Sequence, residues 1–344
     1  MPPRMRVVVV TYNNETDILE CIESLKMVQS VGTEIVVVDN GSSDRTVEVI
    51  TSRFPDVRVI GNKSNLGYAG GNNSALFEPL PEYVVFLNPD TWTEQEWFSS
   101  LLEDLDRCPS AGMAQPRIML YNSRQYLNSR GNEANFLLFG WPEGYGQPDL
   151  PADRCRRISF PSGCAFAVRR DTLRAIGGFD SEYFMYGEDL DIGLRGFLRG
   201  WDVIYSPTAV VYHKYQYRVS PEKYFLLERN RSMTLLKVYR VRTLTLLAPI
   251  LLATEASIIL RSISEGWFVE KVRSYFSVVE NARHIFRERR KIQSSRCRSD
   301  KDLLELLQGG IHFTPIGGSK LVRVGNTLLD RYQSFLLGLR IIGR

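Results

Sequence analysis

The stretch RVVVVTY at residues 6–12 decides the fold class, because four consecutive valines end in polar residues. Continuous β-branched runs are typical of strands buried on both faces of a parallel sheet. Three similar runs follow, EIVVVDN at 34–40, VRVIGN at 57–62 and YVVFLNPD at 83–90, with segments of helical spacing between them. This alternation predicts an α/β fold with a mostly parallel central sheet covered by helices.

Polar residues follow three of these runs at the point where each strand ends. They are Thr11, Tyr12 and Asn13, then Asp39 and Asn40, then Asn88, Pro89 and Asp90. In such sheets the ligand crevice lies outside the carboxyl ends of the strands. A carboxylate such as Asp90 suits a Mg²⁺ or Mn²⁺ that substrate phosphates also hold, although Asn-Pro-Asp is equally good turn chemistry. Asp39 suits a base or ribose, or belongs to a helix-capping system.

The glycine-rich stretch NLGYAGGNN at 65–73 allows the backbone to approach a ligand closely before a helix begins. It is neither a Walker loop nor a GxGxxG fingerprint, so by itself it is weak evidence for a nucleotide site. The absence of GxGxxG after the first strand argues against a dehydrogenase, which is one competing interpretation.

Three carboxylates cluster in EYFMYGEDLDIGLRGFLRG at 182–200, namely Glu188, Asp189 and Asp191. Carboxylates on a half-buried helix start are costly unless they are capped, paired, metal-bound or catalytic. The helix dipole explains one of them comfortably and three less easily. The stretch WDVIYSPTAVVYHK at 201–214 predicts a final pair of strands, and His213 ends the second, where a lone histidine is more often structural than a ligand.

The composition restricts the class of protein. The chain has 344 residues, 44% of them hydrophobic, and a net charge of +4, which indicates a globular protein. Its five cysteines form no CxxC pair, so neither a zinc ribbon nor a disulfide scaffold is indicated and a reducing compartment fits. The apolar run of MPPRMRVVVVTYNN is too short for a signal peptide. Residues 120–160 are rich in Gly, Asn and Pro and predict a long loop.

The rear of the chain is basic, with 18 Lys/Arg against 7 Asp/Glu in residues 214–298. Its most apolar part, Leu244–Leu260, contains Pro249 and Glu255 and is shorter than the roughly 20 apolar residues of a spanning helix. We therefore expect a helix at the membrane surface, flanked by cations that meet anionic headgroups: Arg229, Arg231, Lys237, Arg240, Arg242 and Arg261. The alternative is a helical subdomain with a solvated basic face. Nucleic acid is not expected as a partner, because no nucleic-acid motif accompanies the charge.

In this order the segments resemble the family 2 glycosyltransferases, which have the GT-A fold, and especially their rhamnosyltransferase-like members. The resemblance covers roughly residues 6–214, from VVVVTYNN through VVDNGSSD, NLGYAGGNN, FLNPDTW and the stretch around GEDLD to PTAVVYHK. No single motif is specific, but the ordered set is.

The resemblance implies roles for individual residues. Donor-binding roles fall on Thr11, Tyr12, Asn13, Asp39, Asn40, Asn65, Gly67, Gly71, Asn72 and Asn88. Asn88-Pro89-Asp90 stands where the family keeps its DxD metal motif, with Asn in place of the first acid, which leaves Asp90 as the main carboxylate ligand of Mg²⁺ or Mn²⁺. His213 matches a histidine that some members use as a metal ligand. Glu188 and Asp189 match the family's acidic pair, with Asp189 as general base and Glu188 orienting the acceptor or the loop.

The resemblance also implies an organisation and a function. We expect a catalytic domain at 1–215, with a nucleotide-binding half (1–100) and an acceptor half (101–215), and a membrane-associating helical region at 216–344. The implied activity is inverting transfer of a sugar, with rhamnose suggested, from a nucleotide-sugar donor to a lipid-linked glycan acceptor in envelope polysaccharide biosynthesis. The expected location is cytoplasmic, peripheral to the inner face of the cell membrane. A catalytically silent nucleotide-binding scaffold is the alternative, against which the intact Asp90, Asp189 and His213 argue.

Overall fold

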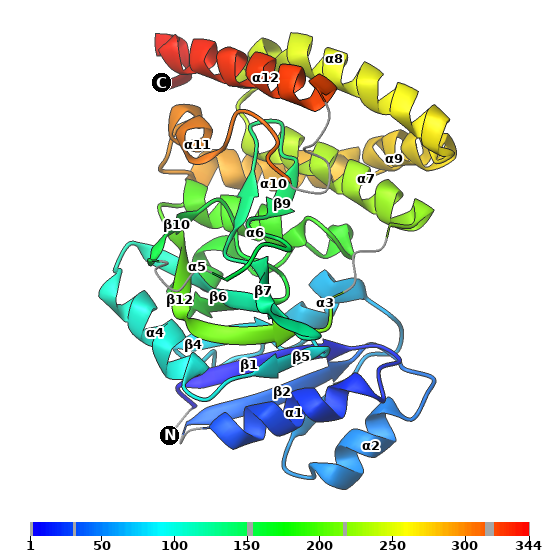
Figure 1. Cartoon of the computed structure of the whole chain (residues 1–344), viewed down its shortest axis with the longest axis vertical. Helices are drawn as coiled ribbons and strands as arrows, with labels where there is room; N and C mark the ends of the chain where they lie inside the picture. Colours follow the sequence, from blue (N-terminus) through cyan, green and yellow to red (C-terminus); the bar gives the residue numbers. More distant parts are fainter. Residues whose placement is uncertain (1–2, 30–31, 150–153, 216–218, 314–319, 344) are drawn as a thin grey trace. The chain divides into compact units, whose positions relative to one another are not determined.

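The computed structural model describes residues 3–29, 32–149, 154–215, 219–313 and 320–343 (Figure 1). The chain forms two compact units. Unit 1 comprises residues 1–132, 142–196 and 201–216, and unit 2 comprises 133–141, 197–200 and 217–344. The functional division into a catalytic domain and a membrane-associating region stays a prediction.

A single sheet forms the centre of unit 1 (Figure 1). Among the described residues its strand order is β10-β12-β6-β11-β4-β1-β2-β3, with β5 added to β12 and β7 to β6. The strands are β1 (Met5–Thr11), β2 (Thr33–Asp39), β3 (Arg58–Gly61), β4 (Tyr83–Leu87), β5 (Thr91–Thr93), β6 (Ala111–Leu120), β7 (Ser123–Ser129), β10 (Arg156–Ile158), β11 (Ala165–Arg169) and β12 (Asp202–His213). β1, β2, β3 and β4 are parallel neighbours, as are β6 and β12, whereas β11 runs antiparallel to both β4 and β6. The α/β class is confirmed.

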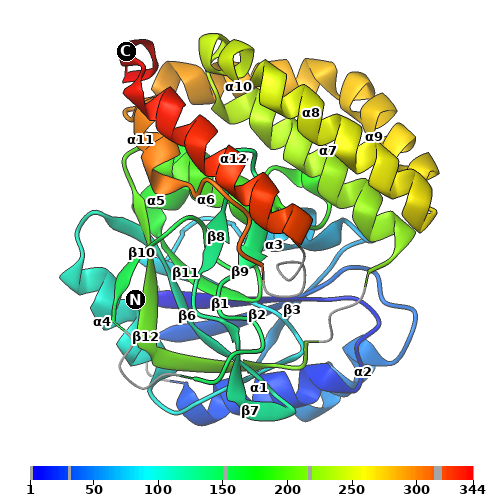
Figure 2. The same ribbon diagram turned by 45° about the horizontal axis from the view of Figure 1, so that its top comes forward.

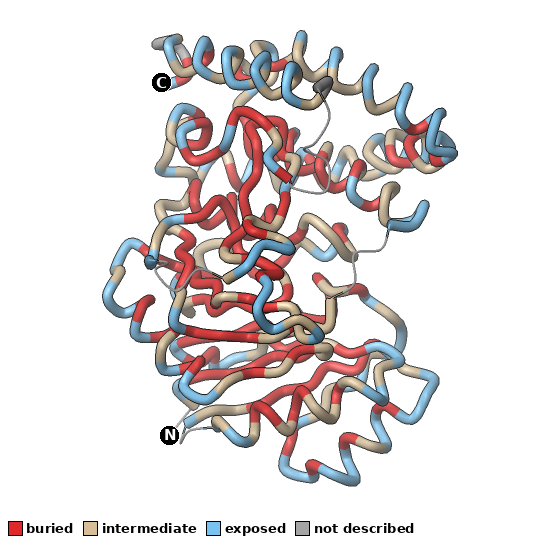
Figure 3. The backbone as a smooth tube through the Cα atoms, viewed as in Figure 1, coloured by how far each residue is buried: buried red, intermediate tan, exposed pale blue. Residues whose placement is uncertain are grey.

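The valines of β1 show why the sheet is covered on both faces. Val7 and Val9 belong to one hydrophobic cluster and Val8 to another, because successive side chains of a strand point to opposite faces. The first cluster includes side chains of α1 (Asp17–Val28), α2 (Thr46–Arg53) and α4 (Trp97–Arg107). The second includes side chains of α3 (Gly67–Ser74), α5 (Arg170–Ile176) and α6 (Glu188–Leu198). In Figure 3 the strands accordingly appear as the buried centre of this unit.

Two expectations about local structure are wrong. The segment 120–160 is not a long loop, because its described residues include β7, β10 and the two-stranded sheet of β8 (Asn132–Ala134) and β9 (Gly140–Pro142). Its glycines serve the turns, since Gly131, Gly144 and Gly146 all have positive φ. The expected pair of strands before residue 214 is the single strand β12, whose register shifts between Ser206 and Val210. Pro207 lies there and has no amide hydrogen to donate, so pairing is interrupted while the strand continues.

Residues 217–344 of unit 2 are mainly helical where the structure describes them, as we expected for the basic C-terminal region (Figure 2). Its helices are α7 (Pro221–Val238), α8 (Val241–Glu265), α9 (Phe268–Glu280), α10 (Ala282–Ser295), α11 (Asp300–Leu306), α12 (Lys320–Gly338) and the short η2 (Arg340–Gly343). α7 begins at a proline after Ser220, whose hydroxyl accepts a hydrogen bond from the Lys223 amide. α11 begins with a reciprocal capping box between Ser299 and Asp302.

A buried ion pair connects α6 to the end of α5 in unit 1. Arg195 donates to Asp191 and to the carbonyls of Ile176 and Gly178, each at 2.7 Å. The Asp191 side chain is fully buried and also accepts from the Tyr183 hydroxyl at 3.2 Å. Asp191 is therefore a structural residue.

We expect Asp191→Asn to lower the free energy of unfolding by about 3–5 kcal/mol, because it leaves the Arg195 charge buried without its partner. Asp171→Asn is the matched control. Asp171 is 75% exposed and lies 3.9 Å from Arg170, so we expect a loss of at most about 1 kcal/mol. Urea denaturation of both variants measures the difference, and equal midpoints would contradict this assignment.

Candidate active site

Strand pairing brings Asp90 and His213 together although 122 positions separate them in the sequence. Asp90 lies between the end of β4 and the start of β5, and His213 pairs with Thr91 where β12 runs antiparallel to β5. His213 Nε2 is 3.3 Å from Asp90 Oδ1. His213 Nδ1 lies 2.9 Å from the amide oxygen of Asn128. Since a carbonyl oxygen only accepts, Nδ1 carries the hydrogen and Nε2 faces Asp90.

The Asp90–His213 pair fits a divalent cation. Asp90 Oδ1 is buried and has no hydrogen-bond partner, because its approach to His213 is not aligned for a hydrogen bond. Burial by itself would raise the pKa of Asp90, but His213, a backbone amide and Lys214 together outweigh burial and lower it. Within the described ranges no group of three or more His, Cys, Asp or Glu side chains could hold a metal. Two protein ligands suit an ion that substrate phosphates and water complete.

Glu188 and Asp189 begin α6 and differ in their surroundings. Asp189 Oδ2 accepts a hydrogen bond from the Gly163 amide at 3.1 Å, and Oδ1 accepts from the Leu190 amide at 2.8 Å. Burial outweighs these bonds and raises the pKa of Asp189 to about 6. Glu188 is only 5% exposed, and its Oε2 has no partner. Burial, reinforced by the Asp189 charge, raises the pKa of Glu188 well above its ordinary value.

Burial thus disfavours the charged form of Glu188 more strongly than that of Asp189, whose carboxylate accepts two backbone hydrogen bonds. Proteins assign an acid and a base to two neighbouring carboxyl groups by giving them environments that shift their pKa values apart. Asp189 is the group that is ionised and able to accept a proton near pH 7.

The segment before Asp189 is strained. Phe184 and Tyr186 have positive φ, which is rare for residues with a β-carbon and is often retained at functional sites. The Phe184 carbonyl accepts a hydrogen bond from the Ala69 amide at 3.1 Å. A β-carbon on Gly67 would overlap this same carbonyl. The glycine at 67 therefore lets α3 approach and hold the segment that positions Asp189.

The other predicted donor-binding residues in α3 and just before it also have structural partners. A β-carbon on Gly71 would lie 2.7 Å from Val10 Cγ1. Asn65 Oδ1 accepts from the Gly67 amide at 2.8 Å, and the Asn72 side chain donates to the Tyr68 carbonyl at 2.9 Å. These contacts explain why small and amide residues occur here, while contact with a donor stays a prediction.

The predicted donor residues after β1 and β2 lie at neighbouring strand ends, since Thr11 pairs in register with Asp39. Thr11 Oγ1 is buried without a partner, whereas the Tyr12 side chain is 48% exposed. Asn13 Oδ1 accepts from the Ser43 amide at 2.8 Å.

Asp39 and Asn40 are buried and hold the turn after β2. Asp39 Oδ2 accepts from the amides of Gly41 and Ser42 at 3.2 and 3.1 Å. The Asn40 side chain donates to the Gly67 carbonyl at 2.9 Å, which connects β2 to α3. A donor contact of either residue is not tested by these bonds.

Sequence reasoning missed the short loop Ser162–Gly163–Cys164, which joins the parts of the site. The Gly163 amide donates to Asp189, and the Gly163 carbonyl accepts from the Tyr68 hydroxyl at 2.6 Å. The Cys164 carbonyl accepts from the Asn88 amide at 2.8 Å. The loop therefore connects the base, α3 and the predicted metal turn. Its only signal in the sequence is PSG directly before a buried strand.

The fold belongs to the GT-A class. A solved structure of GalNAc-T7 with UDP, GalNAc and Mn²⁺ matches with a TM-score of 0.56 and 16% identity, over 68% of this chain and 47% of that one. Residues 1–349 of S. aureus TarS match with a TM-score of 0.50 and 18% identity, over 98% of this chain and 92% of that one. At these identities the likeness concerns the fold, which confirms the expected architecture.

The chain belongs to glycosyltransferase family 2 and is a glycosyltransferase. The model of "Glycosyl transferase family 2" matches residues 6–177. The N-acetylglucosaminyl-diphospho-decaprenol L-rhamnosyltransferase of Mycobacterium tuberculosis is 32% identical over 230 residues, which is 60% of this chain and 75% of that protein. The probable glycosyltransferase YdaM of Bacillus subtilis is 21% identical over 67% of this chain and 54% of its own length. The resemblance to rhamnosyltransferase-like members is confirmed.

The pKa of Asp189 predicts the acid limb of the pH profile. Because a base acts only when it is ionised, kcat/KM should fall about tenfold per pH unit below a pKa of about 6. The initial rate of transfer between pH 5 and 8, corrected for enzyme stability, measures this limb. A profile that is flat down to pH 5 would exclude Asp189 as the titrating base.

Two amide substitutions separate the roles of the acidic pair. Asp189→Asn should lower kcat by roughly 10²–10⁴-fold, because the amide cannot accept the proton. Glu188→Gln should keep most of the activity and the thermal stability, because burial disfavours the charged form of Glu188 and glutamine is neutral and of the same size. Steady-state rates and melting temperatures of both variants test this, and equal loss of activity in the two would contradict the assignment.

Proposed function

We propose that this glycosyltransferase inverts the anomeric centre while it moves a sugar from a nucleotide-sugar donor to a hydroxyl of a lipid-linked glycan, with rhamnose as the first candidate sugar. The observation that carries the proposal is the Asp189 carboxylate, which is oriented by the Gly163 amide and has a raised pKa. The 32% identical relative, which acts on an N-acetylglucosaminyl-diphospho-decaprenol, supports the acceptor class.

The reaction needs one base opposite the leaving group. The acceptor hydroxyl gives its proton to Asp189 as its oxygen bonds to the anomeric carbon. The bond from that carbon to the donor phosphate oxygen breaks, and the nucleoside diphosphate leaves with the electron pair. The amides of Gly163 and Leu190 hold the carboxylate in place throughout. Charge at the anomeric carbon develops as in other glycosyl transfers.

Asp90 and His213 are the residues that would hold a divalent cation, either Mg²⁺ or Mn²⁺. When bound, the cation neutralises charge on the departing diphosphate. Asn128 fixes the ring of His213 so that Nε2 faces the cation site. The orphaned Asp90 Oδ1 and the Mn²⁺ in the GalNAc-T7 structure support this part of the proposal.

The proposed setting is cell-envelope glycan synthesis at the cytoplasmic face of the membrane. The decaprenol-linked substrate of the mycobacterial relative supports it, because such a lipid stays in a bilayer. The poly-beta-1,6-N-acetyl-D-glucosamine synthase of Staphylococcus epidermidis is 21% identical over 58% of this chain and also makes a polysaccharide.

The first experiment measures transfer by the purified chain across a panel of dTDP-, UDP- and GDP-sugars, with N-acetylglucosaminyl diphosphate on a short prenyl chain as acceptor. One donor should release its nucleotide in the presence of Mg²⁺ or Mn²⁺, and the product should have the inverted configuration. Retention of configuration, or no turnover of any donor, would contradict the proposal.

Removal of the metal and removal of its carboxylate ligand should lower the rate of transfer to a similar extent. We expect EDTA, and separately Asp90→Asn, to lower kcat/KM by about 10²-fold or more, because charge on the leaving diphosphate is no longer neutralised. The matched control is Asp56→Asn, a surface residue paired with Lys26 and outside the site. Full activity of Asp90→Asn in EDTA would show that transfer needs no metal.

The space next to Gly163 indicates where the acceptor hydroxyl enters the active site. A β-carbon at Gly163 would lie 3.5 Å from Glu188 Oε1, 3.6 Å from Asp189 Oδ2 and 3.6 Å from Tyr68 Cζ. These are ordinary contact distances, so the protein accommodates a methyl group there, but that group occupies space next to both carboxylates.

Gly163→Ala should therefore fold and bind the donor normally, while kcat/KM for the acceptor falls by about 10-fold to 10²-fold. Gly338→Ala is the matched control, since no atom lies within 4 Å of a β-carbon there. Nucleotide-induced thermal stabilisation and acceptor kinetics measure the two effects. Unchanged acceptor kinetics in Gly163→Ala would place the acceptor elsewhere.

A further inference from the structure

Helix α8 has the length and composition of a membrane-spanning helix. It has 25 residues, and its most apolar 18-residue window has a mean hydropathy of 1.9. Only 11% of that window is buried within the described structure. Composition alone therefore does not distinguish a helix that crosses a bilayer from one that lies on it.

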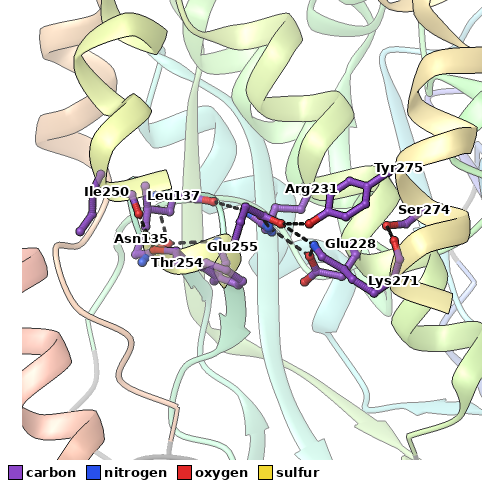
Figure 4. A network of polar contacts seen from close by, with 11 residues as sticks. Asn135, Leu137, Glu228, Arg231, Ile250, Thr254, Glu255, Lys271, Ser274 and Tyr275 are labelled. Atoms are coloured by element: carbon purple, nitrogen blue, oxygen red, sulfur yellow. Dashed lines mark hydrogen bonds and ion pairs between the residues drawn. The ribbon is translucent and has the colours of Figure 1, made fainter. Parts of the chain in front are cut away.

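Glu255, the single acidic residue inside the apolar run of α8, indicates which of these two arrangements the helix adopts (Figure 4). Glu255 Oε1 forms an ion pair with Arg231 of α7. Glu255 Oε2 lies 2.6 Å from Lys271 Nζ and accepts a hydrogen bond from the Tyr275 hydroxyl at 2.6 Å, both on α9. Burial alone would raise the pKa of Glu255, but Arg231, Lys271 and Tyr275 outweigh burial and lower it to about 2.

Glu228 completes the network inside unit 2. It pairs with Arg231 at 3.0 Å and also with Lys271. The side chains of Arg231 and Lys271 are 5% and 0% exposed. Two anions thus balance two cations in a buried site, and moving α8 away would leave two buried cations facing one anion. This network holds α8 against α7 and α9.

Another side of α8, next to Glu255 around the helix, is exposed and mostly apolar. Thr245, Pro249, Leu252, Ala256, Leu260 and Ile263 are exposed and recur every three or four residues, so they share one face of the helix. Leu252 and Leu260 are 71% and 69% exposed. The neighbouring helix α9 adds Val269, Phe276 and Val279, which are 64–72% exposed. We call the exposed apolar residues of α8 and α9 the apolar face.

The charge of the helices that carry the apolar face indicates which kind of partner this face binds. Residues 219–298 hold 16 Lys/Arg and 7 Asp/Glu. The buried network uses two of each, so 14 cations and 5 anions remain outside it. Arg261, Arg273, Arg287 and Lys291 have side chains that are 50–66% exposed, and each lies within 4 Å of a glutamate, so the excess of cations over anions sets the net charge here. An apolar row accompanied by exposed cations is complementary to a bilayer with anionic headgroups.

We propose that α8 and α9 dock unit 2 on an anionic lipid bilayer, with α8 lying in the plane of the membrane and not across it. Leu252 and Leu260 enter the boundary between headgroups and acyl chains, while Glu255 stays paired inside the protein. The inference deepens the membrane-side location in the proposed function.

Vesicle binding by the full chain tests the docking. The chain should sediment with vesicles that contain phosphatidylglycerol, bind much less to phosphatidylcholine alone, and lose affinity in high salt. Leu252→Glu/Leu260→Glu should weaken binding by about tenfold or more, because two apolar groups no longer enter the bilayer. Thr51→Glu/Ser52→Glu, on α2 of unit 1, adds the same charge at exposed positions and should bind like the wild type.

Kinetics on a soluble acceptor separates this inference from the proposed reaction. Leu252→Glu/Leu260→Glu should transfer sugar to a short-chain acceptor at the wild-type rate while it fails to bind vesicles. Unchanged vesicle binding in this variant would overturn the docking inference. A dimer of the wild type that the variant disrupts, together with no vesicle binding, would assign the apolar face to a second copy of the chain.

Labelling from one side of the membrane tests the orientation of α8. Val241→Cys and Ser264→Cys, at its two ends, are made in a chain with its native cysteines replaced by serine. In inverted membrane vesicles from expressing cells, an impermeant maleimide should label both positions from the same side. Labelling of the two ends from opposite sides would show that α8 spans the bilayer.

Discussion

The hydrogen bond from the Gly163 amide to Asp189 is the constraint around which the site is built. It fixes the carboxylate at the start of α6 to a loop that also accepts a hydrogen bond from Tyr68 of α3. The next residue, Cys164, joins the same loop to the turn that carries Asp90. One turn of backbone thus sets the positions of the proposed base and of the proposed metal ligands relative to the same sheet.

Packing around this loop explains why two of the predicted donor-binding residues, Gly67 and Asn40, also have a structural role. Gly67 lets α3 reach the strained segment at Phe184, and Asn40 holds the carbonyl of Gly67 from the end of β2. Because each of these groups already has a partner within the protein, a ligand would meet a preorganised surface. Preorganised polar groups stabilise developing charge without reorganisation during the reaction.

Unit 2 uses charge in a different way. Glu228 and Glu255 neutralise Arg231 and Lys271 between the helices, while other cations such as Arg261 and Arg273 are exposed. The exposed leucines of α8 are unfavourable in water alone. By the docking proposal, a lipid surface with anionic headgroups takes up the apolar row and attracts the cations.

The sequence by itself determined the α/β class, the strand ends that carry polar residues and the family, because valine runs and ordered motifs are local signals. Through the resemblance alone, it also predicted Asp90 and His213 as metal ligands. Tertiary structure alone decided that Gly163 orients Asp189, that residues 120–160 include strands, and that Glu255 points to α7 and α9. These features depend on contacts between distant segments, and a carboxylate in an apolar run has the same sequence whether it faces lipid or a buried arginine.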